Sequence, residues 1–216
     1  MVAGGESIRR DRMIRQLAER GIRSQRVLDA MREIPRETFI DEALRGKAYS
    51  DHSLPIGQTQ TISQPWIVAR MSELIEPTGQ GKVLEIGSGS GYQAAILSKL
   101  FELVYSVERK KELSTRARQV VRQLGIQNVH FKIFDGSYGW SEFAPYRAIL
   151  VTAAAREIPT PLIDQLQDGG HLVLPLVSNG DQQVLTRITR QGTKLRRESL
   201  GPCKFVPLVG KFGDRE

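Results

Sequence analysis

The chain has 216 residues, of which 40% are hydrophobic and 25% are charged. These proportions are ordinary for a globular protein, and the length suits one well-packed domain with an extension rather than two large domains. The formal net charge of +7 would suit an acidic partner such as nucleic acid. Lysine and arginine are, however, spread along the chain, and we interpret most of them as solvated surface. No stretch approaches the ~20 apolar residues that a membrane span requires.

Cysteine and histidine usage restricts the chemistry further. Cys203 is the only cysteine of the sequence, so an intramolecular disulfide and a cysteine metal cluster are excluded. The histidines, His52, His130 and His171, are scattered without metal-ligand spacing. The first residues of the chain are charged rather than apolar, unlike the centre of a secretion signal. We therefore expect a cytoplasmic protein without a metal.

Residues 1–78 have the pattern of a helical extension followed by a substrate loop. Apolar residues recur at helical spacing, Gly21 and Pro35 stop two of the helices, and Ser24 is placed as an N-cap. Residues 49–64 lack periodicity and are rich in turn formers, which predicts a loop. The expected helices cover residues 8–20, 24–34, 39–44 and 65–75.

Residues 79–216 alternate between strand and helix patterns and form the second predicted unit, the core. Such alternation indicates a parallel sheet covered on both faces. The last two strand patterns have no helix between them, which indicates an antiparallel edge. The expected strands cover residues 83–86, 103–107, 129–134, 147–151, 171–175 and 183–189, with helices over 92–100 and 161–167.

A glycine-rich turn joins the first strand of this unit to the following helix. The run Glu85-Ile86-Gly87-Ser88-Gly89-Ser90-Gly91 provides the positive-φ turn and the bare backbone that a bound cofactor needs. A dinucleotide-binding turn would need its third glycine where Tyr92 stands. Three alternate glycines directly after the strand instead resemble the first motif of S-adenosylmethionine-dependent methyltransferases. We therefore predict cofactor contacts from Glu85, Gly87, Ser88, Gly89 and Gly91.

Two further strands end in residues suited to a nucleoside. Glu108 follows the second strand, about 20 positions after the first glycine, where a carboxylate accepts hydrogen bonds from both ribose hydroxyls. Asp135 and Gly136 follow the third strand, where the acid would bind the adenine amino group and the glycine would let the ring lie against the chain. As alternatives, Glu108 is a solvated charge and Asp135-Gly136 is an ordinary turn. Because parallel strands end at one edge of a sheet, we expect one site there.

The loop at residues 54–65 is rich in hydroxyl and amide side chains, which suits substrate contacts. Here the sequence resembles the protein-L-isoaspartate (D-aspartate) O-methyltransferase family. The resemblance extends from about residue 36 to residue 208, and its specific parts are Gln60-Thr61-Ile62-Ser63-x-Pro65 and Val151-Thr152-Ala153-Ala154. Further matching segments are Pro55-Ile56-Gly57, residues 84–93, Val107-Glu108-Arg109, Asp135-Gly136 and residues 165–175.

The resemblance implies a Rossmann-like class I methyltransferase sheet that binds S-adenosylmethionine. It also implies methylation of the free carboxylate of L-isoaspartyl and D-aspartyl residues in damaged proteins and peptides. A free α-type carboxyl has a pKa of about 3.3 to 3.7, so it is ionised at neutral pH and attacks an activated methyl without a general base. The protein must align the reactants and exclude water. We predict Ser63 as the catalytic residue and Gln60, Thr61 and Thr152 as substrate contacts.

Other interpretations stay open from the sequence alone. Ser63 is also placed as the N-cap of the helix that begins near residue 65. A nucleic-acid methyltransferase would share the fold, but an amino-methylating enzyme of that class would have an Asn/Asp-Pro-Pro-aromatic run where this chain has Thr152-Ala153-Ala154-Ala155. A non-catalytic binding module would be expected to have lost the glycine turn, which is intact. We interpret Cys203 as a buried thiol, and we expect a monomer that binds neither nucleic acid nor membrane.

Overall fold

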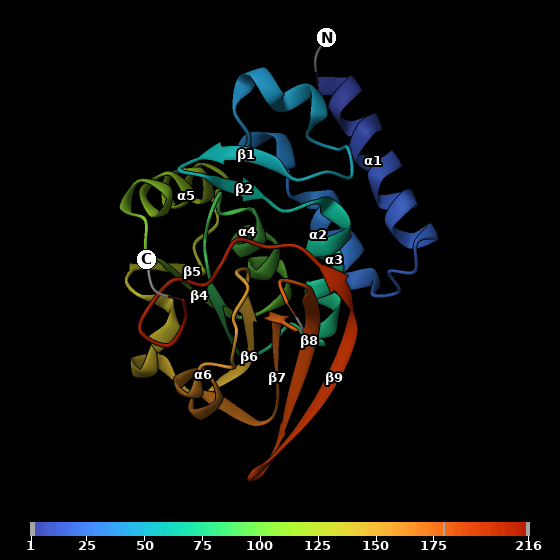
Figure 1. The fold of residues 1–216 in the computed structure, drawn as a ribbon. Coiled ribbons are helices and arrows are strands. Elements are labelled where there is room, and N and C mark those ends of the chain that lie inside the picture. The colour runs from blue at the N-terminus through green and yellow to red at the C-terminus, as the bar shows by residue number, and fades with distance from the viewer. Residues whose placement is uncertain (1–2, 179, 215–216) are drawn as a thin grey trace.

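A seven-stranded sheet forms the centre of the computed structural model, which describes residues 3–178 and 180–214. Its strands lie in the order β5-β4-β3-β6-β7-β8-β9 (Figure 1). The first five pair in parallel, and β7, β8 and β9 pair antiparallel. The bounds are β3 Lys82–Ile86, β4 Leu103–Glu108, β5 Val129–Ile133, β6 Tyr146–Val151, β7 Leu166–Val177, β8 Gln183–Gln191 and β9 Lys194–Cys203.

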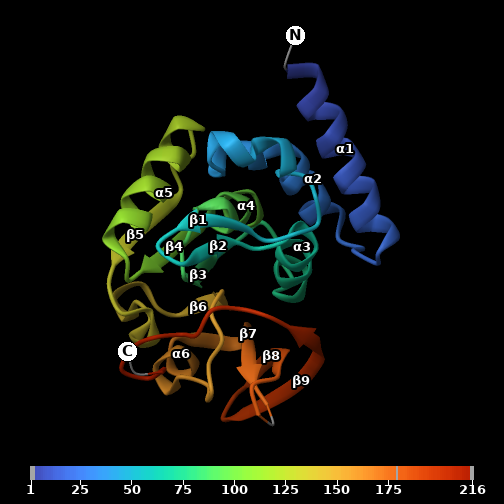
Figure 2. The same cartoon turned by 45° about the horizontal axis from the view of Figure 1, so that its top comes forward.

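Both faces of the sheet are buried, as the predicted α/β class requires. Val83, Val104 and Ala148 belong to one hydrophobic cluster, and their sequence neighbours Leu84 and Tyr105 belong to a second cluster on the other face. Helices α3 to α5 cover the first face, α1 and α2 pack on α3 and α4, and α6 lies on the other face (Figure 2). The helix bounds are α1 Ala3–Glu19, α2 Gln25–Glu33, α3 Pro65–Leu74, α4 Tyr92–Leu100, α5 Lys111–Gln123 and α6 Thr160–Asp164. The mostly parallel sheet with an antiparallel edge is therefore confirmed.

The N-terminal helices pack on the core through the same cluster as the sheet. Met13, Leu17 and Met31 are at most 3% exposed and share that cluster with Val83 and Ala95. The predicted helices at residues 8–20 and 24–34 are confirmed, and the hydroxyl of Ser24 accepts a hydrogen bond from the Val27 N–H at 3.4 Å. The expected helix at 39–44 is replaced by two 3-10 helices, Arg36–Phe39 and Glu42–Lys47. A division of the chain at residue 78 stays a prediction.

The expected loop at residues 49–64 is wrong in part, because it contains an antiparallel hairpin of β1 Leu54–Gly57 and β2 Gln60–Ile62. Gln58 and Thr59 join the two strands with φ of +53° and +57°, the left-handed pair that the right-handed twist of a tight hairpin favours. A branched residue such as Thr59 seldom adopts that conformation. Strands of four and three residues are too short to show alternation in the sequence.

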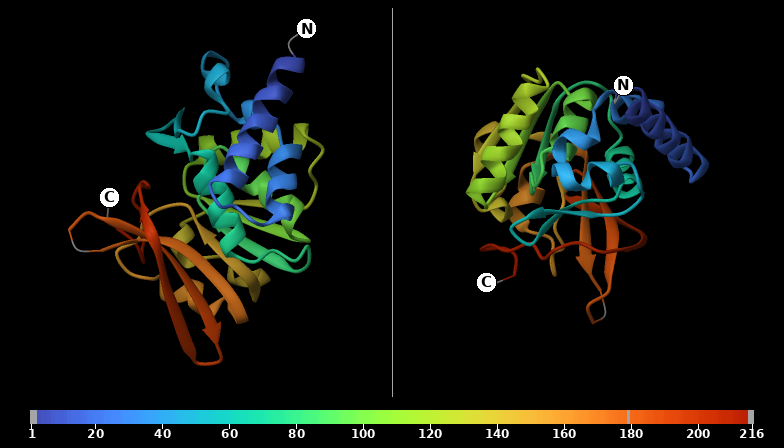
Figure 3. Two further views of the ribbon diagram at one scale, coloured as in Figure 1. Left: turned by 90° about the vertical axis from the view of Figure 1, so that its right-hand side faces the viewer. Right: turned by 90° about the horizontal axis from the view of Figure 1, so that it is seen from above.

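The C-terminal half differs from expectation at two places. Helix α6 ends at Asp164, and Leu166 already pairs with Tyr146 in the sheet, so Gln167 belongs to a strand rather than to the predicted helix over 161–167. The basic segment that begins at Lys194 forms β9 and pairs with β8, a strand that the sequence interpretation missed. The β8–β9 pair extends away from the N-terminal helices (Figure 3). β9 is mostly exposed, so it lacks the apolar alternation from which a strand is predicted.

Helix α3 begins behind the hairpin and is capped from a distant part of the chain. Its N-cap position is Gln64, whose side chain makes no capping hydrogen bond. The carboxylate of Asp51 instead accepts a hydrogen bond from the Trp66 N–H at 3.0 Å and pairs with Arg20 at the end of α1. The alternative that made Ser63 the helix cap is therefore wrong.

Replacing Asp51 by alanine removes the acceptor at the start of α3. We expect Asp51→Ala to lower the free energy of unfolding by about 1 kcal/mol, the usual cost of losing a cap. Asp51→Asn keeps an oxygen acceptor and should lose a smaller part of that stability. Urea denaturation of the three proteins measures the difference, and an alanine variant as stable as the unaltered protein would contradict the capping role.

Candidate functional site

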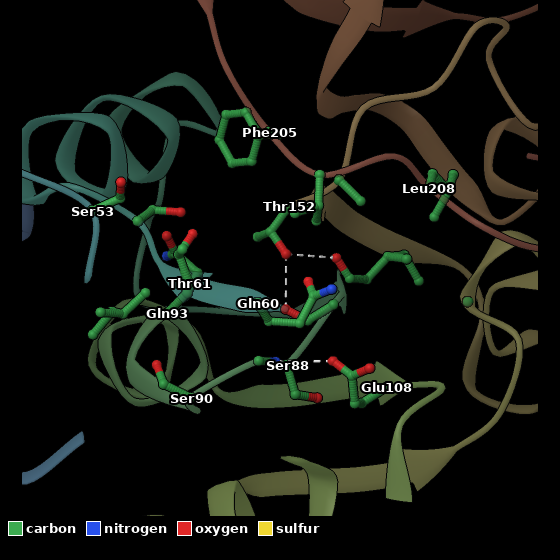
Figure 4. A pocket seen from close by; sticks show the side chains of 18 of the residues that line it. Ser53, Gln60, Thr61, Ser88, Ser90, Gln93, Glu108, Thr152, Phe205 and Leu208 are labelled. Carbon is green, nitrogen blue, oxygen red and sulfur yellow. Dashed lines mark hydrogen bonds between the residues drawn. The ribbon is translucent and has the colours of Figure 1, made fainter. Parts of the chain in front are cut away.

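A cavity of about 590 Å³ opens at the carboxyl edge of the parallel strands. This volume lies within the roughly 300–1,000 Å³ of small-molecule sites. Three parts of the chain line the cavity (Figure 4). They are the ends of the central strands with the start of α4 (residues 86–90, 92–93, 107–110, 136 and 152–153), the hairpin with Ser53 before it and the start of α3 after it (residues 59–64, 67–68 and 71), and the C-terminal segment at 204–209.

The glycine turn keeps its shape because its glycines have no side chains. Gly87, Gly89 and Gly91 have φ of +95°, +51° and +88°, a region that costs glycine little. A Cβ on Gly87 would lie 2.4 Å from Oγ1 of Thr152, and one on Gly91 would lie 3.0 Å from Cβ of Ala117. Gly87 and Gly89 line the cavity, whereas Gly91 begins α4 and packs against α5 outside the lining.

Glu108 lies at the end of β4 and holds the glycine turn. Its carboxylate accepts one hydrogen bond from the Gly89 N–H at 3.0 Å and another from the Lys110 N–H at 2.9 Å. The residue is only 7% exposed but lines the cavity, where Figure 4 shows it beside Ser88. A carboxylate has about four acceptor positions, so two donors leave room for sugar hydroxyls. The interpretation as a merely solvated charge does not fit this burial.

Thr152 joins β6 to the glycine turn. Its hydroxyl lies 2.8 Å from the carbonyl oxygen of Gly87 and 3.0 Å from that of Ile86, so its single proton is directed at the backbone of this turn (Figure 4). The residue lines the cavity as predicted. A substrate carboxylate needs a donor, and in this structure the proton of Thr152 serves the turn instead.

Asp135 and Gly136 have different positions at the end of β5. Gly136 lines the cavity, and a Cβ there would lie 2.5 Å from Ile86. Asp135 lies outside the lining. One oxygen of its carboxylate accepts hydrogen bonds from the N–H and hydroxyl of Ser137, and the other accepts one from the Lys211 N–H at 2.8 Å. The acid thereby fixes both its own turn and the C-terminal segment.

The hairpin brings the predicted substrate residues to the same cavity. Gln60, Thr61 and Ser63 all line it, and Figure 4 shows Gln60 and Thr61 across from Thr152. The carbonyl oxygen of Ser63 accepts a hydrogen bond from Arg36 at 2.7 Å. Among the hydrogen bonds of the described residues, none uses the hydroxyl of Ser63.

Comparison with known sequences identifies the family. A family model described as "Protein-L-isoaspartate(D-aspartate) O-methyltransferase" matches residues 8–213. The chain belongs to this family. Protein-L-isoaspartate O-methyltransferase 2 of Geotalea uraniireducens (strain Rf4) is 53% identical over 209 residues, which cover 95% of each chain. The protein-L-isoaspartate O-methyltransferase of Dictyoglomus thermophilum is 50% identical over 205 residues, which cover 95% of this chain and 93% of the relative.

Solved structures agree with the sequence relatives. A protein-L-isoaspartate O-methyltransferase superposes with a TM-score of 0.87 and 32% identity, over 94% of this chain and 67% of the other. A Plasmodium falciparum methyltransferase of the same description, solved with S-adenosyl-L-homocysteine, has a TM-score of 0.79 and 26% identity over 93% and 98% of the two chains. The predicted enzyme class is thereby confirmed: the enzyme is an S-adenosylmethionine-dependent protein-L-isoaspartate O-methyltransferase.

The described residues also bear on a membrane span, a metal site and the single thiol. None of the helices there is both long and apolar enough to cross a membrane. Within the same part of the chain, no three side chains of His, Cys, Asp or Glu are grouped to hold a metal ion. The thiol of Cys203 is half-buried, and burial raises its pKa to about 11.

Some lining residues escaped the sequence interpretation. Gln93 of α4 is 8% exposed and donates to the Ser72 hydroxyl at 2.9 Å. Phe205 and its neighbours at 204–209 close one side of the cavity through hydrogen bonds that join Val206 and Leu208 to Ala154. Gln93 directly follows the glycine motif, which is a usable signal. The C-terminal segment has no local pattern that places it near residues 50 positions earlier.

Glu85 was predicted as a cofactor contact, and the structure places it beneath the glycine turn. It is fully buried and lies outside the cavity lining. The hydroxyl of Ser106 donates to its carboxyl group and lies 2.6 Å from the hydroxyl of Ser88, which lines the cavity. Burial raises the pKa of Glu85 to about 8, because a low-dielectric interior disfavours the charged form. The folded protein therefore holds this carboxyl protonated at neutral pH.

A protonated Glu85 makes stability depend on pH. The pKa of Glu85 is about 8 in the folded protein, against an ordinary value of 4.5. The contribution of Glu85 to the free energy of unfolding is therefore complete below pH 4.5 and is lost as the pH rises to 8. Each pKa unit corresponds to about 1.4 kcal/mol. We therefore expect Glu85→Gln to gain a few kcal/mol relative to the unaltered protein between pH 5 and pH 8.

Urea denaturation at several pH values in this range measures the effect. Glu102→Gln, which changes an exposed carboxyl, is the matched control and should follow the unaltered protein. If the stability of Glu85→Gln also stays parallel to that of the unaltered protein, the carboxyl is not protonated in the folded state.

Proposed function

We propose that the backbone of Gly87, Ser88 and Gly89, with Glu108 and Gly136, binds S-adenosylmethionine, and that the hairpin binds the isoaspartyl carboxylate. The residues fit this cofactor because Gly87, Gly89 and Gly136 line the cavity with bare backbone, against which a ligand can lie closely. The carboxylate of Glu108 retains acceptor positions for hydroxyl groups. The structural relative solved with S-adenosyl-L-homocysteine, the product left after methyl transfer, supports the same cofactor.

The bound cofactor supplies an activated methyl group on a positively charged sulfur. The acceptor carboxylate is ionised at neutral pH, because its ordinary pKa is about 3.3 to 3.7, and it attacks without losing a proton. The protein's task is therefore to hold an oxygen lone pair in line with the methyl group and to keep water away. Hydroxyl and amide side chains of Gln60, Thr61 and Ser63 at one wall of the cavity suit this task.

Ser63 is the residue that we propose to orient the substrate carboxylate. It lines the cavity, its hydroxyl is not used as a helix cap, and Asp51 performs the capping that the sequence left open. A directional hydrogen bond from this hydroxyl to the carboxylate would fix which lone pair faces the methyl group. The hydroxyl of Ser63 at the cavity wall, which makes no hydrogen bond within residues 3–178 and 180–214, is the observation that supports the proposal most.

Ser63→Ala tests this role. A lost hydrogen bond to a charged group costs about 1.5 to 3 kcal/mol, so we expect kcat/KM for an isoaspartyl peptide to fall roughly 10- to 150-fold. The affinity for S-adenosylmethionine and the melting temperature should change little. Ser50→Ala, in the exposed turn before the hairpin, is the matched control. Normal turnover with a lowered melting temperature would show that Ser63 is structural.

Gly89→Val tests the cofactor part of the site. Its φ of +51° strains any branched side chain, and the valine methyl groups would enter the cavity. We expect calorimetry to detect no S-adenosylmethionine binding while circular dichroism stays unchanged. If the variant binds S-adenosylmethionine with unchanged affinity, the glycine turn is not part of the cofactor site.

The acceptor is tested by transfer of labelled methyl to an isoaspartyl peptide, with the normal aspartyl peptide and RNA as controls. We expect label in the isoaspartyl peptide alone. Label in RNA would favour the alternative of a nucleic-acid methyltransferase. The cytoplasmic location and the monomeric state stay predictions.

A further inference from the structure

Arg36 is a fully buried cation next to the proposed substrate wall. It has 0% exposure at the start of the 3-10 helix Arg36–Phe39. Its Nε donates to the carbonyl oxygen of Ala48 at 2.8 Å and its Nη2 to that of Ser63 at 2.7 Å. Burial lowers the pKa of Arg36, but a guanidinium stays protonated in proteins. The residue therefore carries a desolvated positive charge.

The carboxylates near Arg36 are engaged elsewhere. Glu37 accepts from Arg10 and Tyr49, and Asp51 accepts from Trp66 and Arg20. Among the described residues, no ion pair joins Arg36 to a carboxylate. Asp51 attracts Arg36 only from beyond ion-pair distance, and a buried charge without a directly paired carboxylate is unfavourable. Among the described residues, this cation therefore makes no ion pair of its own.

The guanidinium of Arg36 also lies over the ring of Tyr92, a residue that lines the cavity. The guanidinium carbon of Arg36 lies 4.8 Å from the ring centre of Tyr92, and both Nη1 of Arg36 and the Tyr92 hydroxyl are buried without a hydrogen-bond partner in the described part of the chain. Tyr92 and Ser63 both line the cavity. Arg36 therefore lies directly behind two residues of the cavity wall, one held by a hydrogen bond and the other by stacking.

We propose that Arg36 is the fixed counter-charge for the substrate carboxylate and a positioning residue for the Ser63 segment. The inference rests on the proposed function, because it takes the isoaspartyl carboxylate to bind beside Ser63. An anion arriving there would add a negative charge near a cation that makes no ion pair among the described residues. Through a low-dielectric wall the attraction is stronger than it would be in water.

The chemistry determines which kinetic constant responds. During transfer the carboxylate loses its negative charge as the new C–O bond forms and the methyl–sulfur bond breaks, with the electron pair going to sulfur. A nearby cation therefore stabilises the bound carboxylate more than the transition state, so its loss should raise KM without lowering kcat. The preference for a carboxylate over a neutral group of the same shape should depend on Arg36.

The test compares an isoaspartyl peptide with the same peptide carrying a carboxamide in place of that carboxyl. We expect Arg36→Gln to raise the KM of the acid about tenfold or more while the inhibition constant of the carboxamide stays within about threefold. Arg36→Lys should retain the preference for the acid only at a pH at which the buried lysine stays protonated, because burial lowers a lysine pKa. Arg12→Gln on exposed α1 is the control for a lower net charge, and cofactor affinity with circular dichroism verifies folding.

Each outcome has a defined meaning. An unchanged acid-to-carboxamide preference in Arg36→Gln, or an equal loss of affinity for both peptides, would overturn the inference and leave Arg36 structural. If Arg36→Gln does not fold, Arg36→Met, a neutral side chain of similar length, decides with the same two peptides, because an unchanged preference for the acid in that variant would also overturn the inference. If the unaltered protein does not methylate the isoaspartyl peptide at all, the proposed function fails instead.

Discussion

The site depends on the contact between the Thr152 hydroxyl and the carbonyl oxygen of Gly87. This contact joins the ends of β6 and β3. It requires glycine at position 87, because a Cβ there would lie only 2.4 Å from Oγ1 of Thr152. The turn that follows is then held from the other side by the carboxylate of Glu108 at the Gly89 N–H. Three strand ends thus fix one short backbone segment. A rigid bare turn is what allows a cofactor to bind against backbone rather than against side chains.

Two buried ionisable groups have opposite charge states for related reasons. Glu85 lies beneath the turn with a serine hydroxyl as its described hydrogen-bond partner, so desolvation keeps it neutral. Arg36 lies behind the hairpin and stays charged, since a guanidinium does not release its proton in proteins. A neutral acid under the glycine turn adds no negative charge next to the carboxylate of Glu108, the proposed ribose contact. A permanent cation behind the hairpin suits a carboxylate acceptor.

Helices α1 and α2 contact the site's supporting segments but do not line the cavity. Asp51 connects the end of α1 to the start of α3 through Arg20 and the Trp66 N–H, and Arg36 connects the preceding segment to the Ser63 carbonyl. These contacts fix the base of the hairpin. At its turn, Nζ of Lys110 donates a hydrogen bond to the carbonyl oxygen of Gln58 at 2.6 Å. The extension therefore positions the substrate wall relative to the glycine turn. This gives the helical extension a physical purpose that its apolar periodicity alone did not indicate.

The sequence by itself determined the alternating strands and helices, the glycine turn and the family, because these are written in local periodicity and short motifs. It also named Ser63, Glu108 and Gly136, which the fold brings to one cavity. The tertiary structure decided the rest. The hairpin strands are too short for a periodic signal, Asp51 caps a helix 15 positions away, and residues 204–209 reach the cavity through Ala154. Whether Glu85 touches the cofactor or lies beneath it depends on burial, and burial is set by contacts between segments distant in sequence.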